Sequence, residues 1–207
     1  MAIAADDPPD HGTSATVMNV LTALHARRSH AVLIDPGPGD NELRDIIAAA
    51  AAAPDHGRHR PWRFVVIRAG GRAAFGDVLA EAYHQMCERD NVPPEPARAQ
   101  RERAKPMRAP VIIAVACTAG SDIKVPRHER LASTAAATQN LLLAAAALGY
   151  GAMWRTGWPA GDPYVKTALG LADGDAIVSF VYVGTVPAGT AQPPTRRNLD
   201  GLLRIWP

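Results

Sequence analysis

The longest regular pattern in this chain is one helix-forming run near its middle. Residues 125–149 read VPRHERLASTAAATQNLLLAAAALG. Pro126 stands where a first helical turn tolerates proline, and Gly149 stands where helices commonly end. The run therefore predicts a single long helix. Its small Ala, Ser and Thr side chains suit close packing of another helix against it, so the fold has to be built around this element.

Short apolar segments on both sides of this helix predict a sheet. WRFVVIR (62–68), PVIIAVAC (110–117) and AIVSFVYVGT (176–185) are rich in β-branched and aromatic residues, which is typical of buried strands. GAMWRTG (151–157) predicts a short strand or turn. Helical and strand patterns alternate along the chain, so the predicted class is α+β or mixed α/β, with four or five strands flanked by helices.

Helical periodicity predicts the remaining helices. The first spans Thr16–Arg28, with Ser14 as its cap. The second begins at a capping Asp40 and ends near Ala53, because Pro54 disfavours helical geometry in the residue before it. A third covers residues 72–88, and a short one covers residues 162–170. The apolar positions of the first two helices are Val17, Val20, Leu21 and Leu24, then Leu43, Ile46, Ile47 and Ala50.

Residues 88–109 form the most polar internal segment, and several prolines interrupt it. Two interpretations remain open. The segment is either a solvated excursion or a flap over a site, since long loops in compact domains are often functional.

Composition narrows the class of protein. The net charge of +2, without a dense Lys/Arg block, gives no reason to expect a nucleic-acid partner. Cys87 and Cys117 lack metal-ligand or disulfide spacing, which fits a reducing cytosol. No run is long and apolar enough for a membrane span, and the N-terminus lacks a signal peptide. We expect a cytoplasmic protein with a disordered tail over residues 1–15 and a single domain over residues 16–207.

Common catalytic motifs are absent. The sequence contains no GxxxxGK[ST], no GxGxxG between a strand and a helix, and no GxSxG or HExxH. Asp55, His56 and His59 suggest a metal, but no further ligands stand out elsewhere. We therefore predict neither a metal site nor a catalytic nucleophile.

Two clusters of cations are candidate anion sites. Arg27 and Arg28 close the first predicted helix and Ser29 follows it, so they form either a C-terminal charge pair or a grip for phosphate. Arg155 follows an apolar strand directly, where an unpaired buried guanidinium would be costly. It either reaches solvent or meets a polar ligand.

Three fragments, taken in order, resemble the nitroreductase family of flavin enzymes. They are RRS at residues 27–29, APDHxxxxPW at residues 53–62 and GxxWRTG at residues 151–157. RAPVIIAVAC, KVPRHER and VSFVYVGT fit the short bacterial NAD(P)H nitroreductases of that family as well. The resemblance covers roughly residues 17–187.

The resemblance implies an α+β fold with a central mixed, mainly antiparallel sheet and an intertwined homodimer that binds FMN at its interface. By this resemblance, Arg27, Arg28 and Ser29 hold the phosphate, ribityl chain and ring edge of FMN. Pro54 and His56 approach the same flavin from the other subunit, and Trp154, Arg155 and Thr156 lie beside the ring. The polar loop would then be a wall of the cofactor site, anchored to the sheet by Pro61 and Trp62.

The expected function is hydride transfer from NADH or NADPH, through FMN, to a nitroaromatic, a quinone or a similar flat small-molecule acceptor, by a ping-pong mechanism. A flavin-storing protein without turnover is an alternative, as is flavin fragmentation or reductive dehalogenation on the same fold. Two features depart from the family pattern. Arg196 and Arg197 cannot be aligned with its C-terminal phosphate ligands, and GRHR (57–60) is unusually basic, which would favour an anionic substrate or NADPH.

Overall fold

The computed structural model describes residues 20–120, 124–190 and 200–206. Several predictions lie outside these ranges. They are the tail over residues 1–15, the start of the first helix with its predicted cap Ser14 and with Val17, and the C-terminal Arg196 and Arg197.

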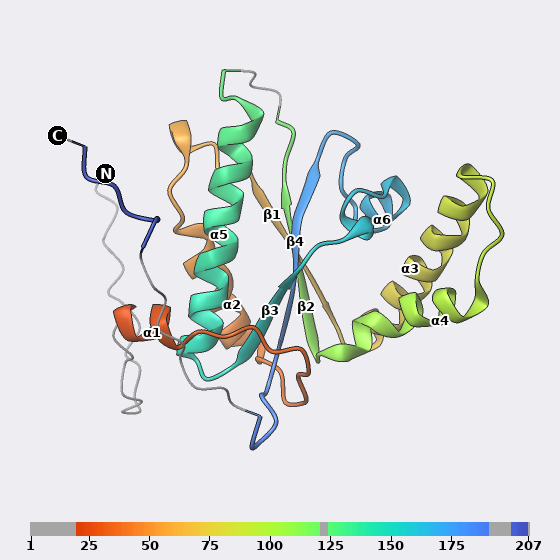
Figure 1. The fold of residues 1–207 in the computed structure, drawn as a ribbon, viewed down its shortest axis with the longest axis horizontal. Helices are drawn as coiled ribbons and strands as arrows, with labels where there is room; N and C mark the ends of the chain where they lie inside the picture. Colours follow the sequence, from red (N-terminus) through yellow and green to blue (C-terminus); the bar gives the residue numbers. More distant parts are fainter. Residues whose placement is uncertain (1–19, 121–123, 191–199, 207) are drawn as a thin grey trace, which may run out of the picture.

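The described chain contains both helices and strands (Figure 1). The α-helices are α1 (Val20–Ala26), α2 (Asp40–Ala51), α3 (Gly70–Arg89), α4 (Pro96–Ala104), α5 (Arg127–Ala147) and α6 (Pro163–Ala168). The strands are β1 (Trp62–Arg68), β2 (Val111–Cys117), β3 (Gly151–Arg155) and β4 (Ala176–Gly184). Three 3-10 turns complete the order: η1 (His56–Arg58), η2 (Lys105–Arg108) and η3 (Trp158–Ala160).

The four strands form one sheet in the order β1-β2-β4-β3, and each neighbouring pair is antiparallel. β2 lies in the interior of the sheet and all its residues are buried, as its unbroken apolar sequence predicts. A single parallel bridge joins Ser29 to Ala152 beside the outer edge of β3. The α+β fold with a mainly antiparallel sheet is therefore confirmed.

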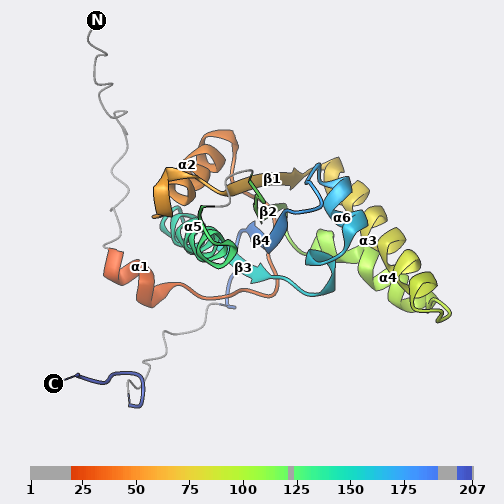
Figure 2. The ribbon, with the colours of Figure 1, turned by 90° about the horizontal axis from the view of Figure 1, so that it is seen from above.

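Helices cover the two faces of the sheet in different ways (Figure 2). α2 and α5 pack on one face, where Ile46, Leu141 and Val181 contribute to the core. α3 and α6 lie on the other side, where Phe75, Ile112 and Val165 form a second apolar cluster. α4 packs along α3 rather than on the sheet, so this pair of helices extends away from the body. Pro61 and Trp62 are both buried, so the loop that precedes β1 is attached to the body at this end.

The structure corrects three details of the sequence analysis. Residues 96–104 of the polar segment form the helix α4, which the sequence analysis did not predict; its buried Glu102 pairs with Lys105. The N-cap of α2 is Gly39, and Asp40 is its first residue. α1 ends at Ala26, so Arg27 and Arg28 follow the helix rather than forming its last turn.

Candidate functional site

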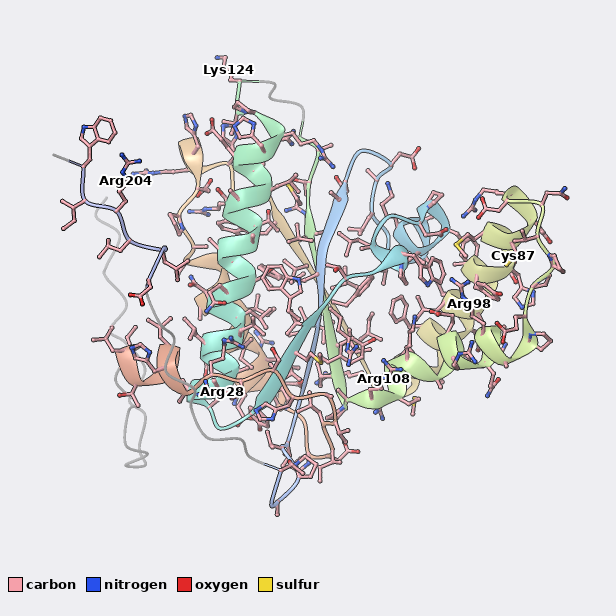
Figure 3. The ribbon with its side chains drawn as sticks, viewed as in Figure 1. Arg28, Cys87, Arg98, Arg108, Lys124 and Arg204 are labelled. Carbon is pink, nitrogen blue, oxygen red and sulfur yellow. The ribbon has the colours of Figure 1, made fainter. Side chains whose placement is uncertain are left out.

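The segment after α1 carries a guanidinium group with unused donors. Arg28 Nη1 donates to the carbonyl oxygens of His25 and Arg27, both at 2.7 Å. Arg28 Nη2 is buried, and no acceptor among the described residues lies within hydrogen-bonding distance. A buried cationic donor without an acceptor is costly unless an anion or a polar ligand meets it. The position of Arg28 at the C-terminal end of α5 can be followed in Figure 3.

This segment then runs beside β3. Ser29 pairs with Ala152, and the His30 N–H donates to the Ala152 carbonyl at 3.2 Å. Arg27, Arg28 and His30 line a hollow of about 170 Å³ against the end of α5, and Arg28, Ser29 and His30 border a neighbouring hollow of about 240 Å³. Burial, followed by the charges of Arg27 and Arg28, lowers the pKa of His30. The positive charges of Arg27 and Arg28 favour a negatively charged ligand in this hollow.

A third hollow, lined by several aromatic side chains, lies at the other end of β3. Trp154, Arg155 and Thr156 line a cavity of about 350 Å³ whose floor includes Phe75, Phe180 and Tyr182. The Arg155 guanidinium lies 5.8 Å from the centre of the Tyr182 ring, within the range of a cation–π contact. Arg155 is half-buried over this aromatic surface.

Two further cations, Lys105 and Arg108, line the same cavity. Lys105 pairs with the buried carboxylate of Glu102, whereas Arg108 is exposed at the end of η2 (Figure 3). Burial raises the pKa of Tyr182, and the charges of Arg155 and Arg108 oppose that rise. Sequence analysis missed Lys105 and Arg108. The available clue was the pair of basic residues in AKPMRAP immediately before a buried strand.

Pro54 and His56 lie far from Arg28 within one chain. His56 Nδ1 contacts Glu129 Oε2 at 2.5 Å, in the first turn of α5. The hollow at Arg28 lies against Ala146, near the other end of α5. Glu129 and Ala146 are 17 residues apart, and a rise of about 1.5 Å per residue separates them by about 25 Å. The structure thus aligns residues 27–29 with β3 but keeps Pro54 and His56 at the opposite end of the helix.

Within the described part of the chain, His, Cys, Asp and Glu side chains nowhere gather in a group of three or more that could hold a metal ion. Across residues 20–120, 124–190 and 200–206, none of the helices has the length and apolar character needed to cross a membrane.

A model of the nitroreductase family matches residues 15–185. The chain belongs to this family. Its nitroreductase relatives include "Putative NAD(P)H nitroreductase YdjA" of Escherichia coli K12, which is 36% identical over 168 residues, covering 81% of this chain and 88% of that protein. "Putative NAD(P)H nitroreductase" of Haemophilus influenzae is 31% identical over 169 residues, covering 81% and 89%.

Solved nitroreductase structures share the fold. A nitroreductase-like family protein from Bacillus cereus superposes with a TM-score of 0.78 at 22% identity, covering 94% of this chain and 99% of that one. A nitroreductase from Desulfovibrio desulfuricans, crystallised in complex with FMN, superposes with a TM-score of 0.69 at 28% identity, covering 93% and 99%.

A hydrogen bond near the Arg28 hollow should make the stability of this protein depend on pH. The Tyr150 hydroxyl donates to Glu42 Oε2 at 2.7 Å and links the start of α2 to the turn before β3. Burial, followed by this hydrogen bond and the charge of Glu42, raises the pKa of Tyr150 from 10.0 to about 12. An unfolded tyrosine loses its proton near pH 10, so between pH 10 and about 12 the folded state binds more protons. Stability should therefore fall as the pH rises through this window.

The substitution Tyr150→Phe should remove this part of the alkaline loss. It should also lower the free energy of unfolding at about pH 8 by about 1 kcal/mol, because one hydrogen bond is lost. Urea unfolding of both proteins between pH 8 and pH 12 measures both effects. Two curves with the same pH dependence would contradict the prediction.

Proposed function

We propose that this protein is an FMN-dependent oxidoreductase that takes hydride from NADH or NADPH and delivers it to a flat small-molecule acceptor, such as a nitroaromatic or a quinone. Family membership and the NAD(P)H nitroreductase names of its relatives support the reaction class. The observation that carries the proposal is the alignment of two sites along β3. An unsatisfied guanidinium lies beside the start of the strand, and a cationic cavity with an aromatic floor lies at its end.

These sites fit the two ends of FMN. The phosphate would be bound by Arg27, Arg28 and Ser29. The planar guanidinium group matches phosphate oxygens, and the buried Arg28 Nη2 has no acceptor among the described residues. The cavity at Trp154, Arg155 and Thr156 would hold the ring, and its volume of about 350 Å³ lies within the usual range for small-molecule sites. The FMN complex of the Desulfovibrio relative supports the same cofactor.

When bound, FMN supplies the hydride chemistry. The chain's own residues bind it, orient it and set the local charge. Lys105, Arg108 and Arg155 would favour negative charge in the cavity, although the carboxylate of Glu102 offsets part of the Lys105 charge. Phe180 and Tyr182 would exclude water from one side of the ring. In the proposed ping-pong mechanism the nicotinamide leaves before the acceptor enters the same space.

A homodimer would complete this site. α1 exposes Val20 and Leu21 to 69% and 65%, and the C-terminal segment exposes Ile205 and Trp206 to 85% and 81%. Apolar surfaces of this kind usually mark interfaces. A two-fold axis across α5 would place its first turn beside the last turn of the partner's α5. Pro54 and the partner subunit's Arg28 would then border one flavin, which the 25 Å separation within one chain does not allow.

The test starts from the purified protein under anaerobic conditions. We expect a yellow protein whose molar mass by light scattering is that of a dimer. NADH or NADPH should bleach its colour, and a quinone or a nitroaromatic should restore it. A colourless protein would reject FMN binding. A yellow protein that neither nucleotide bleaches would reject the oxidoreductase and favour flavin storage or another flavin reaction. Because Cys87 and Cys117 are free and buried, we also propose a cytoplasmic location.

A further inference from the structure

The loop between α2 and β1 holds arginine residues in a backbone conformation that they seldom adopt. Gly57, Arg58 and Arg60 have φ angles of 69°, 57° and 47°. The left-handed region suits glycine and is uncommon for other residues, because the Cβ atom crowds the backbone. Such conformations persist where the surroundings fix them, and they cluster at ligand clamps and active sites.

Contacts at both ends fix this loop. The Arg60 N–H donates to Asp55 Oδ2 at 2.8 Å, and His56 contacts Glu129. Beyond the loop, the Thr118 N–H donates to the carbonyl of the buried Pro61 at 2.6 Å. Arg58 and Arg60 are therefore presented by a backbone that is held in place before and after them.

Arg58 and Arg60 carry charges that no carboxylate among the described residues pairs with. Both side chains are exposed, and neither forms an ion pair or a side-chain hydrogen bond with the described residues. Two carboxylates contact this loop, but neither pairs with a guanidinium group of it: Asp55 accepts the backbone N–H of Arg60, and Glu129 contacts His56. Two guanidinium groups two residues apart suit a phosphate monoester, a dianion with several acceptor oxygens.

We propose that Arg58 and Arg60 bind the 2′-phosphate of NADPH and make NADPH the preferred reductant. This inference rests on the proposed function, in which the partner's loop borders the flavin site. In that dimer the adenosine half of a dinucleotide whose nicotinamide lies on the flavin would extend out of the cavity toward this loop. NADPH differs from NADH only in the 2′-phosphate, so the two nucleotides are distinguished by cations that reach this phosphate, which lies on the adenosine half.

The test replaces both arginines with glycine. Arg58→Gly combined with Arg60→Gly removes two charges, and glycine adopts a positive φ without steric cost, so the Tm should stay equal or rise. Calorimetry on the FMN-loaded protein should show NADP⁺ binding at least about ten-fold more tightly than NAD⁺, and the double variant should lose this difference. The ratio of kcat/KM for NADPH over NADH should fall in parallel. The control pair Arg44→Ala and Arg101→Ala removes the same charge from α2 and α4 and should keep the difference.

Several outcomes would overturn the inference. One is equal binding of NADP⁺ and NAD⁺ to the wild-type protein. Another is an equal loss for both nucleotides in the glycine variant, which would assign the loop to a part that they share. Loss of FMN from the variant would assign the loop to the flavin phosphate instead. A wild-type protein that binds no flavin, or whose flavin neither nucleotide bleaches, would instead reject the proposed function itself.

Discussion

Replacing Arg28 with alanine should weaken FMN binding by about one to two decades. The reason is the buried Nη2 group. Nη1 donates to two carbonyl oxygens, whereas the described residues provide no acceptor for Nη2. Losing a charged donor to phosphate typically costs about 1.5–3 kcal/mol, which corresponds to that range of affinity. The dissociation constant can be measured by adding FMN back to the apoprotein and following the quenching of flavin fluorescence.

The matched control is Arg101→Ala. Arg101 lies on α4, exposed, with a loose 3.6 Å contact to Glu95, so its loss should leave FMN affinity unchanged. Arg28→Lys is the second comparison, because lysine keeps the charge but lacks the planar fork and should recover only part of the affinity. The same dissociation constant for Arg28→Ala and Arg101→Ala would remove Arg28 from the phosphate site.

The sequence alone predicts the helices and strands whose residue pattern determines which of their positions are buried. β2 is apolar at every position and lies in the interior of the sheet. α5 has its predicted limits to within two residues, because Pro126 and the glycine after Leu148 bound an uninterrupted helical run. The end of α2 likewise follows from Pro54.

α4 could not be predicted in this way. Its sequence, PARAQRERA, carries almost no apolar periodicity, and its one buried position is Glu102. That carboxylate is tolerated because Lys105 pairs with it, and this pairing depends on the tertiary fold. The hydrophobic pattern therefore gave no reason to expect a helix there, although the initial proline and the Ala, Arg, Gln and Glu residues after it favour one.

The site was predicted only in part for a related reason. Residues 27–29 and 154–156 stand in short motifs, so the resemblance could single them out. The cavity also needs Phe75, Lys105 and Tyr182, which come from three other elements and meet only when α3 and η2 pack beside β4. The spacing of these residues along the sequence does not indicate that their side chains lie together in the fold. The separation of His56 from Arg28 likewise becomes evident only once α5 lies between them.

Mixed dimers should show whether His56 and Arg28 serve one flavin from opposite chains. His56→Ala alone should cost about 1 kcal/mol of FMN affinity, the usual value of one neutral hydrogen bond or edge contact. In a heterodimer of a His56→Ala chain and an Arg28→Ala chain, a shared site concentrates both defects at one flavin and leaves the other flavin intact. Contributions from contacts at separate parts of the ligand are close to additive, so the doubly defective site should bind about two to three decades more weakly than the wild type.

The titration of such heterodimers, purified through two different affinity tags, should therefore be biphasic. Half of the sites should bind FMN with wild-type affinity, although each parent homodimer has no such site. If both residues instead act on the flavin of their own chain, every site in the heterodimer carries one defect. The wild-type phase is then absent, provided that each parent homodimer binds FMN measurably more weakly than the wild type. Beyond that condition, the outcome depends on which sites are intact and not on the energies assigned to Arg28 or His56. Heterodimers without a wild-type phase would thus contradict the arrangement in which α5 of one subunit brings its His56 end to the partner subunit's Arg28.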